Sequence, residues 1–172
     1  SGSGSWNTTG RNYVGWGWKA GGTASSNSNG SITSQVSANP SAGFSIVSWT
    51  GKTTHPDTIG HGLSQKLEMI IIKNRDRAIK WPVYAEPMGN TKALLLDESS
   101  TPSTDTGYWN NTTPTSSVFT TGNGYSYSSG GAVEDYIAYC FHSVDGHSKV
   151  GSYVGNGSAD GTFVHCGFRP AF

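Results

Sequence analysis

The sequence contains little charge and no excess of either sign. Only 13% of its 172 residues are charged, and eleven basic residues balance eleven acidic ones, which gives a formal net charge of zero. A protein that binds nucleic acid needs a basic surface to neutralise the phosphates. The composition therefore predicts no nucleic acid partner.

Long apolar runs are also missing. No stretch approaches the roughly 20 apolar residues of a membrane-spanning helix, and no basic start followed by an apolar middle marks a secretory signal. We therefore expect no membrane insertion. The chain has only two cysteines, Cys140 and Cys166, too few for a disulfide framework. They could form one bridge or remain free thiols in a β core.

The abundant residues favour an all-β fold. The chain has 24 glycines and 12% aromatic residues, so it is too rich in glycine for helices and too aromatic for disorder. Short apolar segments separated by turn sequences predict an antiparallel β-sandwich of the jelly-roll or lectin-like kind. The predicted strands are 13–18, 44–49, 67–72, 81–84, 93–96, 118–119, 125–127, 136–141, 149–154 and 162–165.

The length suits one domain with a proper core. Residues 1–12 are interpreted as a flexible linker or the end of a preceding unit, and residues 13–172 as a single sandwich domain. The most apolar run, Leu67–Ile72, is expected to be buried on both faces. Residues 53–62 are expected to form a loop, and residues 97–117 a long surface excursion.

The end of the chain repeats its beginning. Asn12–Ala20 (NYVGWGWKA) returns as Asp135–Ser143 (DYIAYCFHS), 123 positions later, with apolar and aromatic character kept almost throughout. Ser48–Gly51 (SWTG) returns as Ser152–Gly155 (SYVG), 104 positions later. A period of this length is typical of tandem arrays of whole domains. Residues 135–172 therefore resemble the start of a second repeat unit.

Catalytic and metal-binding patterns are not evident. A glycosidase needs two carboxylates that face each other across the sugar, whereas the neighbours Asp97–Glu98 and Glu134–Asp135 would point to opposite faces of a strand. These four residues are expected to be exposed turn carboxylates. We predict that the protein is not an enzyme and has no catalytic residue.

The histidines also lack the spacing of metal ligands. His142 and His147 flank the Asp145–Gly146 turn and could approach each other, but nothing in their spacing establishes a site. His61 is expected to make a backbone hydrogen bond from a loop. We predict no metal and no cofactor.

Aromatic residues in polar loops are the candidate binding residues. Tyr108, Trp109, Tyr125 and Tyr127 lie among Gly, Ser and Asn. Flat aromatic faces bind sugars and also occur in protein interfaces. The sequence therefore predicts recognition by these four rings, while the alternative is that they fold back to cover the edges of the sandwich.

Several sequence segments resemble an uncharacterised domain that is common in marine bacteriophage virion proteins, where it occurs in tail or fibre-associated chains. They are Asn29–Ser34, Ala42–Val47, Ile71–Arg75, Trp109–Phe119, Tyr136–Phe141 and Gly151–Gly161. Members of that family often lie beside lectin-like domains in long structural proteins. The family has no assigned catalytic residues to transfer to this chain, and its sequences usually continue from the Gly167–Phe172 segment into another Ile/Val-rich strand.

The resemblance implies a non-enzymatic virion structural protein, located in a tail fibre or other appendage. Other virion subunits, further copies of the chain and a host surface glycan are the expected partners. Two alternatives remain open: a capsid decoration protein that binds the shell, and a carbohydrate-active enzyme or carbohydrate-binding module.

Overall fold

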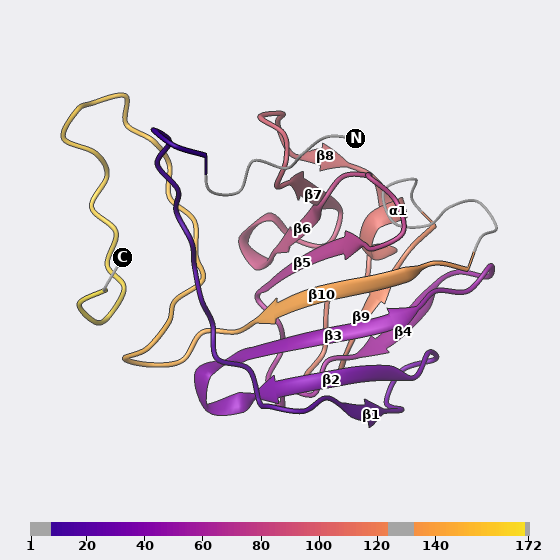
Figure 1. The fold of residues 1–172 in the computed structure, drawn as a ribbon. Helices are drawn as coiled ribbons and strands as arrows, with labels where there is room; N and C mark the ends of the chain where they lie inside the picture. Colours follow the sequence, from indigo (N-terminus) through magenta and orange to yellow (C-terminus); the bar gives the residue numbers. More distant parts are fainter. Residues whose placement is uncertain (1–7, 124–132, 171–172) are drawn as a thin grey trace.

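The computed structural model describes residues 8–123 and 133–170 and shows an all-β, antiparallel sandwich (Figure 1). The main sheet has the strand order β1-β2-β3-β10-β5-β6-β7-β8, and the second sheet pairs β4 with β9. In chain order the strands are β1 (Ser25–Asn27), β2 (Ser34–Asn39), β3 (Phe44–Thr50), β4 (Asp57–Gly60), β5 (Met69–Asn74), β6 (Pro82–Ala85), β7 (Lys92–Leu95), β8 (Ser103–Thr104), β9 (Val118–Thr121) and β10 (Asp135–Phe141).

Helical structure is confined to single turns. They are η1 (Pro40–Ala42), η2 (Glu86–Met88) and α1 (Thr106–Trp109). The predicted all-β class is confirmed. A chain so rich in glycine and β-branched residues lacks the long runs of helix formers that a stable helix needs.

The central strand of the main sheet is the last one in the sequence. β10 lies between β3 and β5 and pairs with both along nearly its whole length, for example through Ala138, which is opposite Val47 on one side and Ile72 on the other. Side chains along β10 alternate between buried and half-buried. One face of β10 therefore packs into the sandwich and the other faces outward.

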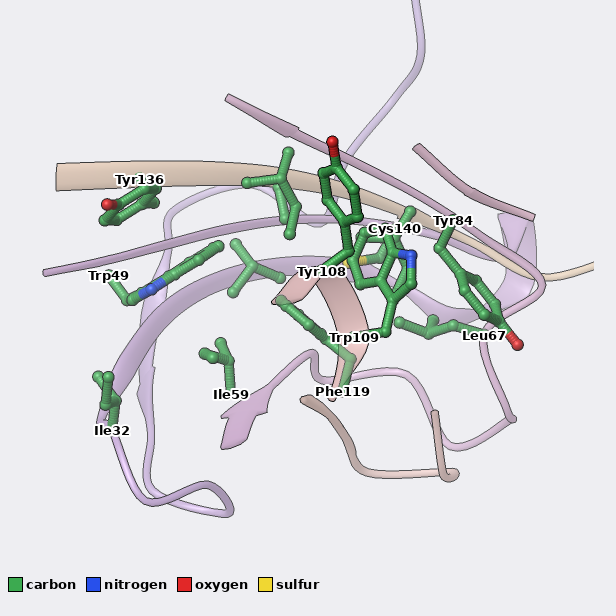
Figure 2. Close-up of a cluster of buried hydrophobic side chains, with 14 of the residues drawn as sticks. Ile32, Trp49, Ile59, Leu67, Tyr84, Tyr108, Trp109, Phe119, Tyr136 and Cys140 are labelled. Atoms are coloured by element: carbon green, nitrogen blue, oxygen red, sulfur yellow. The ribbon is translucent and has the colours of Figure 1, made fainter. Parts of the chain in front are cut away.

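The core lies between the two sheets and combines aromatic with aliphatic side chains (Figure 2). Trp49 stacks on Tyr136 with ring centroids 5.5 Å apart, and it meets Phe119 of the second sheet edge-on at 5.7 Å. Such pairs add to the free energy gained by burying large rings. The small sheet and α1 together cover the middle of the larger sheet.

The polar stretch before β3 forms a hairpin of β1 and β2, and the Asn29–Gly30 turn lies between them. A Cβ atom added at Gly30 would lie only 2.1 Å from the carbonyl oxygen of Thr58. Only glycine permits the turn to approach β4 so closely. This contact holds the hairpin against the small sheet.

One loop prediction and one burial prediction need correction. Residues 53–62 were expected to be a loop, but they contain β4, which pairs with β9 through Ile59 and Phe119. The run 67–72 is not buried on both faces, because β5 alternates between half-buried and buried side chains. The outer face of the main sheet has no second sheet over it among the described residues.

Three predicted strands are absent. Residues 13–18, 149–154 and 162–165 are extended but form no strand. Their alternating pattern is that of a strand, but none of them has a backbone ladder to a neighbour in the structure. The predicted strand 125–127 lies outside the described residues.

Candidate functional site

The outward face of the main sheet carries a row of apolar side chains. In register across four strands, Ile46 of β3 lies beside Tyr139 of β10, then Ile71 of β5 and Val83 of β6. Ile46, Tyr139 and Ile71 are only half-buried. An apolar sheet face that remains partly exposed is typical of an interaction surface.

An aromatic cluster continues this face at the end where β10 finishes. Phe44 and Phe141 are paired across β3 and β10 with centroids 4.9 Å apart, and Trp18 contacts both, at 6.2 and 5.8 Å. Trp18 is still 53% exposed. This contact fixes the root of the N-terminal segment, residues 12–20, on the outer face of the sheet.

The N-terminal segment and the C-terminal segment, residues 148–170, both leave the sandwich at this end (Figure 1). A hydrogen bond of 3.0 Å from the Val150 amide to the Ser143 hydroxyl holds the root of the C-terminal segment. Beyond these roots, nearly all residues of both segments are exposed.

Eight of the ten exposed large hydrophobic side chains in the described residues belong to these two segments. They are Tyr13, Val14, Trp16, Trp18, Tyr153, Val154, Phe163 and Val164. A soluble domain rarely concentrates so much apolar surface on segments outside its core unless something covers it. The two segments and the apolar row together form the candidate interaction surface.

The internal repeat explains why these segments are so apolar. The N-terminal segment repeats β10, and the C-terminal segment repeats β3 from Ser148 onward. In the sandwich the originals are the two adjacent central strands. Each exposed segment therefore carries a side-chain pattern suited to the interior of a sheet.

Two of the four predicted binding rings are in the core, which is a correction. Tyr108 is 6% exposed and Trp109 only 1%. The Trp109 indole N–H donates to the Lys92 carbonyl at 2.9 Å, and its ring meets Tyr84 edge-on at 5.6 Å (Figure 2). Neither ring presents a face to a ligand.

Both rings are buried because residues 106–109 form a helical turn, α1, which the loop-like composition of this stretch did not predict. The carboxylate of Asp105 accepts the Gly107 amide at 2.7 Å and caps the start of α1, while Asn110 ends it in a left-handed conformation. This turn directs both aromatic rings into the sandwich. The other two predicted rings, Tyr125 and Tyr127, lie outside the described residues.

Glu134 is buried rather than exposed, which corrects a second expectation. Its carboxylate forms an ion pair with Arg77, accepts the Asn74 amide at 2.6 Å and accepts the Tyr136 hydroxyl at 3.3 Å. Burial and the adjacent Glu134 charge raise the pKa of Tyr136 to about 12. The cluster ties the start of β10 to the turn after β5, which is a structural role that the sequence did not suggest.

Asp97 and Glu98 are exposed, as predicted, whereas Asp135 is half-buried and begins β10 rather than lying in a turn. Asp97 accepts the Trp81 amide at 3.0 Å, and Glu98 forms an ion pair with Lys80. Asp135 accepts the Thr50 hydroxyl at 2.7 Å. None of these contacts brings two carboxylates together across an open site.

His61 makes the backbone contacts that were predicted. Its Nε2 lies 3.3 Å from the Thr115 carbonyl, and its Nδ1 accepts the Leu63 amide at 3.2 Å. Nε2 therefore carries the proton of a neutral ring. Burial lowers the pKa of His61 to about 4.

Among residues 8–123 and 133–170, no three His, Cys, Asp or Glu side chains lie close enough together to hold a metal ion. His142 is buried and its Nδ1 lies 2.8 Å from the Ser143 carbonyl, whereas His147 is exposed. Both cysteines are free thiols, Cys140 buried and Cys166 partly exposed. Across the same residues, no helix is long and apolar enough to cross a membrane.

A polar cleft of about 330 Å³ lies at the end of β10, lined by Gln65, Lys66, Glu68, Glu86, His142 and Ser143. Its carboxylates are already engaged: Glu68 accepts the Ser143 amide at 2.9 Å, and Glu86 pairs with Lys66 at 3.1 Å. Through Ser143, Glu68 stabilises the root of the C-terminal segment.

Comparisons with known proteins identify one family. Searches of curated proteins and of solved structures gave no match. The sequence profile of a domain of unknown function, DUF7483, matches residues 1–172 and so spans the sandwich and both end segments. The chain therefore belongs to the DUF7483 family.

Proposed function

We propose that the protein is a non-enzymatic structural protein of a bacteriophage virion, a domain of a tail fibre or other appendage that assembles with other subunits. The observation that carries this proposal is the concentration of exposed apolar side chains on two segments outside the sandwich. Such segments suit permanent contacts with neighbouring subunits. The resemblance of the sequence to virion domains supplies the biological setting.

The test is to locate the chain on particles of the phage that encodes it. Mass spectrometry of purified virions and electron microscopy with a gold-labelled antibody would be combined. Label on the tail or an appendage is the expected result. Label on the head would replace it with the alternative of a capsid decoration protein, and absence from the virion would overturn the proposal.

A host surface glycan is the proposed ligand of the appendage. Because Trp109 is buried, the ring to test is that of Trp16, which is 63% exposed and flat enough to stack on a sugar. Leu96, which is 59% exposed, provides a matched control on the sandwich itself. Selective binding on a glycan array should be lost in Trp16→Ala and kept in Leu96→Ala.

Absence of glycan binding by the folded wild-type protein would contradict the ligand while leaving the structural role in place. The enzymatic alternative makes a different prediction. It requires depolymerisation of a host polysaccharide that disappears on substitution of a single carboxylate, such as Glu68→Gln at the polar cleft. That outcome would contradict the non-enzymatic proposal.

A further inference from the structure

The polar cleft at the end of β10 is built on elements that are fixed to one another. Glu68, just before β5, and Glu86, at the start of η2, both line it. The Glu68 amide donates to the Phe141 carbonyl at 2.9 Å, and the Glu86 amide donates to the Glu68 carbonyl at 2.8 Å. Two carboxylates from different elements are therefore held on one frame, as a preorganised binding site requires.

Each of these two carboxylates uses only one oxygen within the protein. Oε2 of Glu68 accepts both the amide and the hydroxyl of Ser143, and Oε1 of Glu86 pairs with Lys66 at 3.1 Å. In the described part of the chain, neither Oε1 of Glu68 nor Oε2 of Glu86 has a hydrogen-bond partner. An ionised carboxylate accepts through both oxygens. The cleft therefore has two carboxylate oxygens that are free to accept from a ligand.

A buried histidine adds a third acceptor. His142 is only 8% exposed and lines the cleft. Its Nδ1 lies 2.8 Å from the Ser143 carbonyl, which can only accept, so Nδ1 carries the proton and Nε2 of the neutral ring keeps a lone pair. Nε2 has no partner among residues 8–123 and 133–170, yet it is not closed off from solvent. Because the cleft is the solvent-facing space that this ring lines, a polar atom of a nine-tenths buried side chain is left for a ligand there.

The spacing of the three acceptors indicates the size and kind of ligand. Glu68, Glu86 and His142 do not lie close enough together to share one metal ion. They nevertheless line one cleft of about 330 Å³, at the lower end of the range of about 300–1,000 Å³ that is typical of small-molecule pockets. None of the lining side chains is apolar. The cleft therefore suits a small molecule that carries several polar groups at separate positions.

The chemistry of the cleft favours hydroxyl groups without negative charge. The three acceptors need donors, while Lys66 and Gln65, which also line the cleft, can donate to a ligand. A hydroxyl group both donates and accepts, and a sugar ring carries several of them at separate positions. Two carboxylates and one ammonium leave the cleft with a net charge of −1 when His142 is neutral. An acidic sugar would therefore be repelled.

We propose that the polar cleft binds one sugar residue that has no acidic group, with Oε1 of Glu68, Oε2 of Glu86 and Nε2 of His142 accepting protons from its hydroxyl or amino groups. This inference rests on the glycan ligand of the proposed function and gives that ligand a contact other than Trp16. It does not depend on where the chain lies on the virion.

The first test is saturation-transfer NMR on the full chain. The probes are D-glucose, D-galactose, D-mannose and D-glucosamine at millimolar concentration, and D-glucuronate is the acidic control. Transfer to at least one of the four probes and none to D-glucuronate is the expected result. Transfer to none of the four, or equal transfer to D-glucuronate, would overturn the proposal.

Two matched carboxylate variants then locate the bound sugar. Glu86→Ala removes an acceptor from the cleft together with an ion pair to Lys66, whereas Glu98→Ala removes a similar ion pair, to Lys80, away from the cleft. Both carboxylates are partly exposed, so both variants should fold. Glu86→Ala should weaken binding about tenfold or more, since a hydrogen bond to a charged group is lost, and Glu98→Ala should leave it unchanged. Equal binding by the two variants would overturn the proposal.

Trp16→Ala separates failure of the cleft from failure of the proposed ligand. Sugar binding that is kept in Glu86→Ala but lost in Trp16→Ala would leave the glycan ligand in place and overturn the cleft as its site. Absence of sugar binding by the folded wild-type protein would overturn the cleft, while location of the chain on virions still tests the structural role. Circular dichroism in the near ultraviolet confirms that each variant is folded.

Discussion

β10 and residues 12–18 have nearly the same apolar pattern but very different surroundings. Ala138 is fully buried between Val47 and Ile72, while its counterpart Gly15 has nothing within 4 Å of where a Cβ would be. The comparison shows that the alternation of apolar and polar residues determines which face of a strand is apolar. It does not determine which neighbouring strand will pair with it. A strand forms where a neighbouring backbone is in place to accept and donate its hydrogen bonds.

The largest expected effect tests this comparison directly. Ala138→Asp places an unpaired carboxylate in the core between β3 and β5, so we expect it to reduce the free energy of unfolding by on the order of 4 kcal/mol. Gly15→Asp at the matched position should change it by less than about 0.5 kcal/mol. Urea denaturation measures both, and similar losses would show that residues 12–18 are part of the cooperative sandwich.

Two tryptophans give a second contrast, between the sandwich core and the exposed N-terminal segment. Trp109→Ala removes a ring that is 1% exposed and should cost about 3 to 5 kcal/mol through the cavity it leaves. Trp16→Ala removes an exposed ring and should leave the unfolding midpoint almost unchanged. Calorimetry measures the midpoint temperature of unfolding of both variants. An unchanged midpoint in Trp109→Ala would mean that this ring does not stabilise the core.

A smaller expected effect is the pH dependence that His61 gives to the free energy of unfolding of the sandwich. The folded pKa of His61 is about 4, below the value of about 6.5 in the unfolded chain, so the unfolded state binds a proton first as the pH falls. The contribution of His61 is complete above pH 6.5 and is lost progressively toward pH 4, by about 3 kcal/mol in total. His61→Gln keeps a donor for the Thr115 carbonyl and removes this titration.

The measurement is the free energy of unfolding at a series of pH values for both proteins. The wild-type curve should fall more steeply than the His61→Gln curve between pH 6.5 and 4. Parallel curves would mean that the ring is accessible to protons in the folded state.

The sequence predicted the fold class and most central strands because their apolar patterns are strong. β3 and β10 were expected within one residue of their observed limits. β4 was missed, since Asp57 and Thr58 at its start are polar and its pairing with β9 is a long-range contact. Such contacts leave no local signal.

The candidate site was less predictable. Polar neighbours suggested that Tyr108 and Trp109 would be exposed, but four residues of helix turn both rings inward. The apolar outer row could have been noticed, because β5 carries apolar residues at both alternating positions. The Glu134–Arg77 ion pair joins residues far apart in the sequence, so only the folded chain shows it.

The place of β10 in the main sheet has a consequence for synthesis. β3 and β5 both leave the ribosome well before β10, so neither can pair with β10 until residues 135–141 have been made. Residues 12–18 carry a similar pattern and emerge 123 positions earlier. The nascent chain therefore contains a competitor for its own central strand, and correct folding requires the later copy to displace the earlier one or to arrive at an unoccupied position.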